Sequence, residues 1–187
     1  MPLNIGVVRE TAQVEARVAL TPDVAAKLVE HQAVLHLERG IGARTHLADD
    51  LYPNATFHDS AADVLRAANV LLKVQPPTVA EVGMLEPSSV VIGFMQPHKE
   101  LELVRALCER RITAFAMELV PRISRAQSMD ALSSQAAASG YKAALLAANA
   151  LDKFLPMLTT AAGTIRPAQV VLIGAGVAGL EAIVTAK

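Results

Sequence analysis

One glycine-rich segment constrains the fold of this chain more than any other stretch. The apolar run at residues 170–173 is typical of a buried strand, the sequence Gly174-Ala-Gly176-Val-Ala-Gly179 follows it at once, and residues 180–187 have a helical pattern. A strand, a G-x-G-x-x-G turn and a helix in this order indicate a dinucleotide-binding βα unit. Gly174 would permit the tight turn, Gly176 would let backbone amides approach a pyrophosphate, and Gly179 would let the helix pack closely on the strand.

The helix after this turn would offer free N–H groups and a partial positive charge to the phosphates. We therefore predict that Val177 and Ala178 bind the cofactor together with the three glycines. A glycine-rich turn in an ordinary βα unit is the less favoured alternative. The acidic residue that holds the ribose hydroxyls in such folds lies about 20 residues past the motif. That position is beyond Lys187, so we expect the chain to be a fragment or one piece of a split polypeptide.

Short apolar segments alternate with helical ones before this unit. Segments with the character of strands are residues 4–8, 33–38, 69–74, 89–94 and 112–117. Such an alternation is typical of a parallel α/β sheet. The sequence therefore predicts a parallel-sheet, Rossmann-like α/β domain at residues 1–130. Residues 131–187 would supply a long linking helix and the first βα unit of a truncated, NAD-binding Rossmann domain.

Three local features follow from the same patterns. The alanine-rich stretch 131–155 predicts a helix of about 25 residues with Gly140 as a weak point inside it. Residues 156–169 are expected to be a linker loop. Cys108 is the single cysteine and falls in a helical pattern, so we expect a buried, inert thiol.

Composition excludes several function classes. The formal charge of −1 provides no basic field for nucleic acid or an anionic membrane, and the absence of Trp argues against a base-stacking platform. The longest uncharged stretch, residues 167–180, is shorter than the roughly 20 residues of a spanning helix. No signal-peptide pattern opens the chain, so we expect a cytoplasmic protein. The five histidines lack metal-ligand spacing, and we predict no metal.

A polar segment, "PRISRAQSMDALSSQ" at residues 121–135, lies between an apolar strand and the alanine-rich helix. Its arginines, amides and carboxylate could hold the ribose and carboxamide of a nicotinamide nucleotide. Alternatively, Asp130 could cap the long helix while the arginines are solvated loop charges. The residues alone leave these two interpretations equally open.

The sequences "AMELVPRISRAQSMDALSSQ", "TAAGT" and "GAGVAGL" carry a family resemblance, with "EARVALTP" and "LLKVQPP" nearer the start. Over essentially its whole length the chain resembles the N-terminal part of the NAD(H)-binding domain I in the alpha subunit of proton-translocating NAD(P) transhydrogenases, and more distantly the alanine dehydrogenases. The resemblance implies that Arg122, Gln127 and Asp130 position the nicotinamide, with Ser133 also binding the cofactor. It implies no side chain that acts as acid or base.

The resemblance also implies partners. NADH bound here would pass hydride to NADP(H) on a partner domain, coupled to proton translocation through a membrane domain. The NAD-binding part would be a homodimer, cytoplasmic and peripherally associated with the inner membrane through its partner subunits. It would bind no nucleic acid.

Two alternatives accompany this interpretation. Arg17 and Lys73 match the residues that bind the keto acid in alanine dehydrogenases. Those enzymes also use a histidine soon after the strand at residues 89–94, whereas the nearest histidine here, His98, lies several positions too late. We therefore favour the interpretation that Arg17 and Lys73 are paired structural charges. The alternative is that they bind the keto acid of an NAD-dependent amino-acid dehydrogenase. The other alternative is a non-catalytic fragment that completes a nucleotide site with a partner chain.

Overall fold

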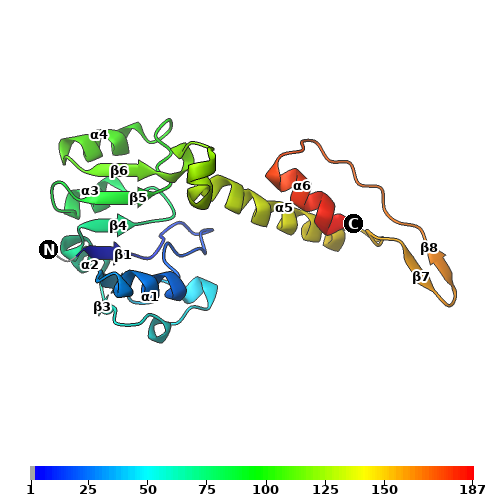
Figure 1. Ribbon diagram of the computed structural model, residues 1–187, viewed down its shortest axis with the longest axis horizontal. Helices are drawn as coiled ribbons and strands as arrows, with labels where there is room; N and C mark the ends of the chain where they lie inside the picture. Colours follow the sequence, from blue (N-terminus) through cyan, green and yellow to red (C-terminus); the bar gives the residue numbers. More distant parts are fainter. Residues whose placement is uncertain (1–2) are drawn as a thin grey trace. The chain divides into compact units, whose positions relative to one another are not determined.

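The computed structural model describes residues 3–187, which form two compact units, one ending at Val120 and one running from Pro121 to Lys187. In the first unit, strands and helices alternate along the chain (Figure 1). The strands are β1 (Asn4–Val7), β2 (Val34–Glu38), β3 (Thr56–His58), β4 (Val70–Leu72), β5 (Val90–Gly93) and β6 (Thr113–Ala116). The helices are α1 (Pro22–Glu30), α2 (Ala61–Ala67), α3 (Val79–Met84) and α4 (Leu101–Glu109).

The six strands of the first unit form one sheet in the order β3-β2-β1-β4-β5-β6. Every neighbouring pair is parallel, which confirms the predicted parallel α/β class. The order reverses between β1 and β4, because the chain crosses from one half of the sheet to the other. In open α/β sheets, ligands bind outside the carboxyl ends of the strands at such a point.

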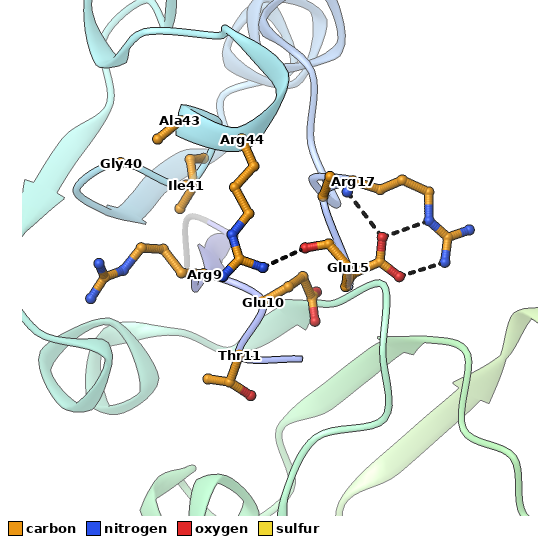
Figure 2. Close-up of a pocket in the computed structure, with 10 residues that line it drawn as sticks. Arg9, Glu10, Thr11, Glu15, Arg17, Gly40, Ile41, Ala43 and Arg44 are labelled. Atoms are coloured by element: carbon orange, nitrogen blue, oxygen red, sulfur yellow. Dashed lines mark hydrogen bonds and ion pairs between the residues drawn. The ribbon is translucent and has the colours of Figure 1, made fainter. Parts of the chain in front are cut away.

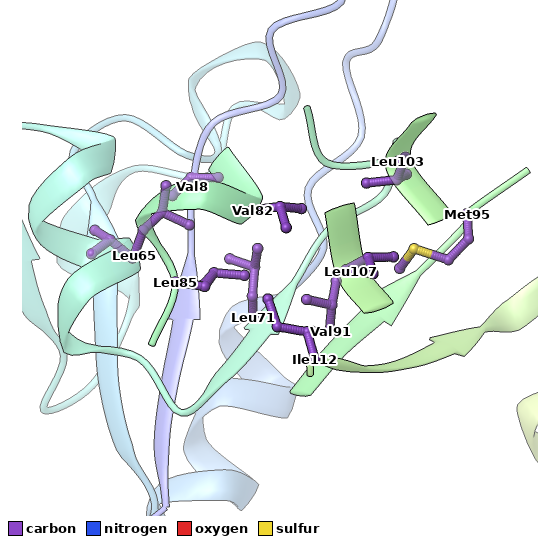
Figure 3. Close-up of a cluster of buried hydrophobic side chains, with 11 residues drawn as sticks. Val8, Leu65, Leu71, Val82, Leu85, Val91, Met95, Leu103, Leu107 and Ile112 are labelled. Atoms are coloured by element: carbon purple, nitrogen blue, oxygen red, sulfur yellow. The ribbon is translucent and has the colours of Figure 1, made fainter. Parts of the chain in front are cut away.

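Helices cover both faces of this sheet. Leu71 of β4 and Val91 of β5 pack with side chains of α2, α3 and α4 on one face (Figure 3). Successive residues of a strand point to opposite faces. Accordingly, Ile5 and Val7 of β1 belong to a second buried cluster, which includes Ala25 of α1. The unit is thus a three-layer α/β/α arrangement with an apolar core on each side of the sheet.

The helix ends follow ordinary capping chemistry. Pro22 opens α1, and the Ser60 side chain accepts a hydrogen bond from the Asp63 amide at the start of α2. The expectation of a buried Cys108 is wrong, because the thiol is exposed. Helix α4 buries Leu103 and Leu107, and the residue after Leu107 is turned about 100° away from this face by the helical repeat.

The second unit contains α5 (Ala131–Ala150), a short hairpin of β7 (Leu158–Thr160) and β8 (Gly163–Ile165), and α6 (Val177–Ala186). The predicted helix to residue 155 is therefore too long. Pro156 explains the difference: its ring would clash with the carbonyl of residue 152, and it disfavours helical geometry at residue 155. The predicted linker loop is also wrong in part, because it contains the hairpin.

The predicted strand at residues 170–173 is not formed. Within residues 3–187 no strand pairs with it, and the Ile173 side chain is fully exposed. A single segment cannot satisfy its backbone groups as a strand without a neighbour. The predicted domain division after residue 130 stays a prediction.

The central strands dominate the stability of the first unit. Leu71 in β4 has no exposed surface, and we expect Leu71→Ala to lower the free energy of unfolding by about 2–5 kcal/mol, since it removes buried methyl groups and leaves a cavity. Leu101→Ala, at a side chain with 59% exposure, should change it by less than about 0.5 kcal/mol. Urea unfolding measures both; equal losses would contradict this core assignment.

Candidate functional site

The polar segment folds into a short 3-10 helix, η4 (Ser124–Met129), that leads into α5. Asp130 is the N-cap residue of α5. Its carboxylate accepts hydrogen bonds from the Ser133 amide at 2.9 Å and from the Ser133 hydroxyl at 2.6 Å. These bonds, with the positive charge of Arg122, lower the pKa of Asp130. The structure therefore brings Asp130 and Ser133 together and gives Asp130 a capping role.

The other two predicted loop residues lie at the surface. The side chains of Arg122 and Gln127 are both exposed. The backbone carbonyl of Gln127 accepts a hydrogen bond from the Asp130 amide at 3.3 Å. This bond ties the end of η4 to the start of α5. Capping and nucleotide positioning are compatible roles for Asp130, because a carboxylate has lone pairs for several donors.

The glycine turn has the backbone that its sequence predicts. Gly174 has a φ of +107°, a conformation that side-chain-bearing residues rarely adopt. Gly176 is the N-cap of α6 and provides no side chain to bond the first amides of the helix. A Cβ at Gly179 would fall on the Gly174 carbonyl oxygen. Around Gly174 and Gly176 there is open space, so a ligand can approach the backbone closely, as a pyrophosphate requires.

Helix α6 packs on α5 beside this turn. Gly140 and Ala144 are the buried residues of α5. A Cβ at Gly140 would overlap the Ala178 carbonyl oxygen and lie 2.8 Å from its carbonyl carbon. Sequence reasoning treated Gly140 only as a weak point in a helix. The structure gives it a packing role that the sequence could not reveal, since Ala178 lies 38 residues away.

A separate hollow of about 400 Å³ lies in the first unit, at the carboxyl ends of β1 and β2 (Figure 2). Half of its ten lining residues are charged, and the lining comprises Arg9, Glu10, Thr11, Glu15, Ala16, Arg17, Gly40, Ile41, Ala43 and Arg44. The segment that follows β1 forms one wall. The guanidinium of Arg44 holds this segment by donating to the backbone carbonyls of Ala12 and Glu15, each at 2.9 Å.

The two predicted cations near this hollow are both paired. Arg17 donates from Nε and Nη2 to the carboxylate of Glu15 at 2.8 and 2.6 Å. The buried Lys73 ammonium lies 3.0 Å from Glu81 and 3.7 Å from Glu10. The expectation of paired charges is thus confirmed. Of the three partners, Glu15 and Glu81 are close in sequence to the cations they pair with, whereas Glu10 lies 63 residues from Lys73 and only the fold brings the two together.

His98 is exposed in the turn before α4. Among residues 3–187 there is no group of three or more His, Cys, Asp or Glu side chains placed to hold a metal ion. No helix in this part of the chain is long and apolar enough to cross a membrane.

Together these features define an α/β protein with a parallel six-stranded sheet and a dinucleotide-type glycine turn. Residues 6–139 match the model of the alanine dehydrogenase/PNT N-terminal domain, and residues 143–187 match that of the C-terminal domain. The chain therefore belongs to the alanine dehydrogenase/PNT family.

Known relatives come from both branches of this family. The chain is 42% identical to an NAD(P) transhydrogenase alpha-subunit protein of Rhodospirillum rubrum, over 99% of this chain and 50% of that protein. The crystal structure of transhydrogenase from Sinorhizobium meliloti matches with a TM-score of 0.92 and 41% identity, over 98% of this chain and 55% of that one. An L-alanine dehydrogenase structure matches with a TM-score of 0.87 and 26% identity, over 98% and 52%. The chain thus spans about half the length of these relatives.

The ion pair between buried Glu15 and partly exposed Arg17 predicts a pH dependence of stability. The hydrogen bonds from Arg17 lower the pKa of Glu15 from 4.5 to about 2, against the opposing effect of burial. A lowered folded-state pKa contributes stability above the ordinary pKa, and this stability is lost as pH falls from 4.5 to about 2. Because the Arg17 side chain is 42% exposed and solvent screens the pair, the contribution is on the order of 1–2 kcal/mol.

Glu15→Gln removes this titration while preserving the shape of the side chain. We expect the stability difference between wild type and Glu15→Gln to shrink as pH falls from about 5 to about 2. Urea unfolding at several pH values measures it. A difference that stays constant over this range would show that the Glu15 carboxylate is not held in its charged form.

Proposed function

We propose that this chain is the NAD(H)-binding part of a transhydrogenase, in which hydride passes from NADH to NADP⁺ on a partner domain. The observation that carries the proposal is the glycine turn: Gly174 adopts a positive φ, and Gly176 leaves the first amides of α6 without a side-chain cap. Such amides and the positive end of the helix favour a pyrophosphate. Family membership and the two transhydrogenase relatives support the choice of nucleotide.

The polar segment would hold the other end of the nucleotide. Arg122 and Gln127 are exposed beside the capped start of α5, where they can donate to the ribose and carboxamide. Gln127 can also accept a hydrogen bond. These residues would fix the nicotinamide ring for transfer, and no side chain of this chain needs to gain or lose a proton.

The bound nucleotide itself supplies the hydride. The contribution of the protein would be orientation of the reacting ring and exclusion of water. In the complete enzyme we propose that the NAD-binding part is a homodimer. Its partners would be an NADP-binding domain and a membrane domain through which transfer is coupled to proton translocation, so that the NAD-binding part lies on the cytoplasmic side of the inner membrane.

The second candidate is an NAD-dependent amino-acid dehydrogenase, favoured by the hollow near Arg17 and Lys73. The exposed position of His98 in a turn speaks against it, because an acid or base must reach the substrate within hydrogen-bond distance. The third candidate, a non-catalytic module that completes a nucleotide site, would bind the nucleotide without hydride transfer.

Nucleotide preference tests the proposal in the complete enzyme. We expect calorimetric titration to give at least tenfold tighter binding of NADH than of NADPH. The enzyme should not oxidise NADH when pyruvate and ammonia are supplied. Tighter binding of NADPH would overturn the proposal, and pyruvate-dependent oxidation of NADH that is lost in Lys73→Met would identify the dehydrogenase instead.

Substitutions in the polar segment can distinguish orientation of the nicotinamide from capping of α5. Gln127→Asn keeps the amide but shortens its reach, and we expect single-turnover hydride transfer to fall by about tenfold or more, equivalent to about 1.4 kcal/mol, with a smaller change in NADH affinity. Asp130→Asn is the matched test of the cap, since Asn caps helices as well as Asp does. It should keep the melting temperature and lower the transfer rate.

The opposite pattern would assign the segment to structure alone. Wild-type transfer rates in both Gln127→Asn and Asp130→Asn, together with a lower melting temperature in Asp130→Ala, would show that Asp130 only caps α5. The Asp130→Ala change should cost about 1 kcal/mol in either case.

A further inference from the structure

Two parts of the proposed nucleotide site are attached to the same helix. Asp130 and Ser133 form the amino end of α5, directly after the polar segment. Gly140 lies seven residues beyond Ser133, which corresponds to about 10 Å along a helix axis. At Gly140 the backbone of α5 meets Ala178, the second residue of α6.

This contact is between main chains. A Cβ at position 140 would lie 2.8 Å from the carbonyl carbon of Ala178 and 2.9 Å from its Cα. Backbone atoms in a helix cannot rotate away as a side chain can. Any residue other than glycine must therefore push the first turn of α6 away from α5, and the turn at Gly174 and Gly176 would move with it.

The hollow beside the contact is continuous with the turn. It measures about 460 Å³, and Gly140 lines it together with Gly174, Gly176 and Gly179. Its walls are therefore formed by the α5 backbone on one side and by the glycine turn on the other. A displacement of α6 would move the glycine turn as a unit relative to α5.

We propose that Gly140 is a positioning residue that sets the spacing between the pyrophosphate-binding turn on α6 and the nicotinamide-binding segment at the start of α5. The pyrophosphate and the nicotinamide of a dinucleotide are joined through a single ribose, so the distance between them has an upper limit. Helix α5 acts as a rigid spacer between the two ends, and the missing side chain at Gly140 fixes where α6 joins it. The proposal rests on the proposed function and deepens it.

The test compares two glycine-to-alanine changes in the complete enzyme. Gly140→Ala adds one methyl group at the contact, and Gly83→Ala adds the same group to α3, where nothing lies within 4 Å. Both changes raise helix propensity by up to about 1 kcal/mol, so the control corrects for that effect. The readouts are single-turnover hydride transfer at saturating NADH, the Kd of ADP-ribose and the melting temperature.

ADP-ribose is the informative probe because it contains the pyrophosphate but lacks the nicotinamide. Bound ADP-ribose would move together with the glycine turn, so its affinity should not depend on the spacing. The nicotinamide of NADH must also reach the polar segment. We expect Gly140→Ala to lower the transfer rate at least tenfold, with the Kd of ADP-ribose within threefold of that of Gly83→Ala. A substitution that only weakens the fold would instead lower the melting temperature and ADP-ribose affinity while leaving the rate at saturation unchanged.

The results separate the spacing role of Gly140 from the proposed function. A transfer rate within twofold of that of Gly83→Ala, or losses confined to stability and ADP-ribose binding, would overturn the spacing role while leaving the proposed function intact. Failure of the wild-type enzyme to bind NADH and ADP-ribose would overturn both. If Gly140→Ala does not fold, Ala144→Ser, one turn further along the same buried face of α5, should lower the rate about threefold, and an unchanged rate there would likewise overturn the proposal.

Discussion

Helix α6 packs on α5 at a point where two backbones meet without an intervening side chain, and the arrangement of the second unit depends on this contact. Gly140 allows the approach, and Ala178 at the start of α6 fills the space that a side chain would occupy. The glycine turn before α6 is thereby fixed relative to the amino end of α5. The same small residue type thus serves two purposes in this unit: a positive φ at Gly174 and a close helix contact at Gly140.

The first unit is organised by a different constraint, the burial of ions at the carboxyl edge of its sheet. Lys73 is buried, and the carboxylates of Glu10 and Glu81 lie 3.7 and 3.0 Å from its ammonium; removing one partner of a buried pair is costly, because the remaining ion stays uncompensated. Glu15 binds Arg17 in the same region and also accepts a hydrogen bond from the Gln75 side chain at 2.6 Å. Glu15 thus takes two of the side-chain N–H groups of Arg17, and Glu10 and Glu81 flank the ammonium of Lys73.

Local patterns were sufficient to predict much of this structure. The apolar segments became parallel strands because helices cover both faces of the sheet. Two differences arise where partners distant in sequence decide the outcome. Within residues 3–187 no strand pairs with the predicted strand at residues 170–173, and Gly140 lies against Ala178. The earlier end of α5 and the exposed Cys108 are local differences. For the candidate site, the sequence predicted the glycine turn, while the Ser133 bonds to Asp130 became visible only in three dimensions.

A crystal structure of the complete enzyme with bound NADH would test the central claim most directly. The account predicts the pyrophosphate at the first amides of α6, beside Gly176 and Ala178, and the nicotinamide within hydrogen-bond distance of Gln127. Nucleotide density in the hollow near Arg17 instead, or a nicotinamide remote from the polar segment, would contradict it.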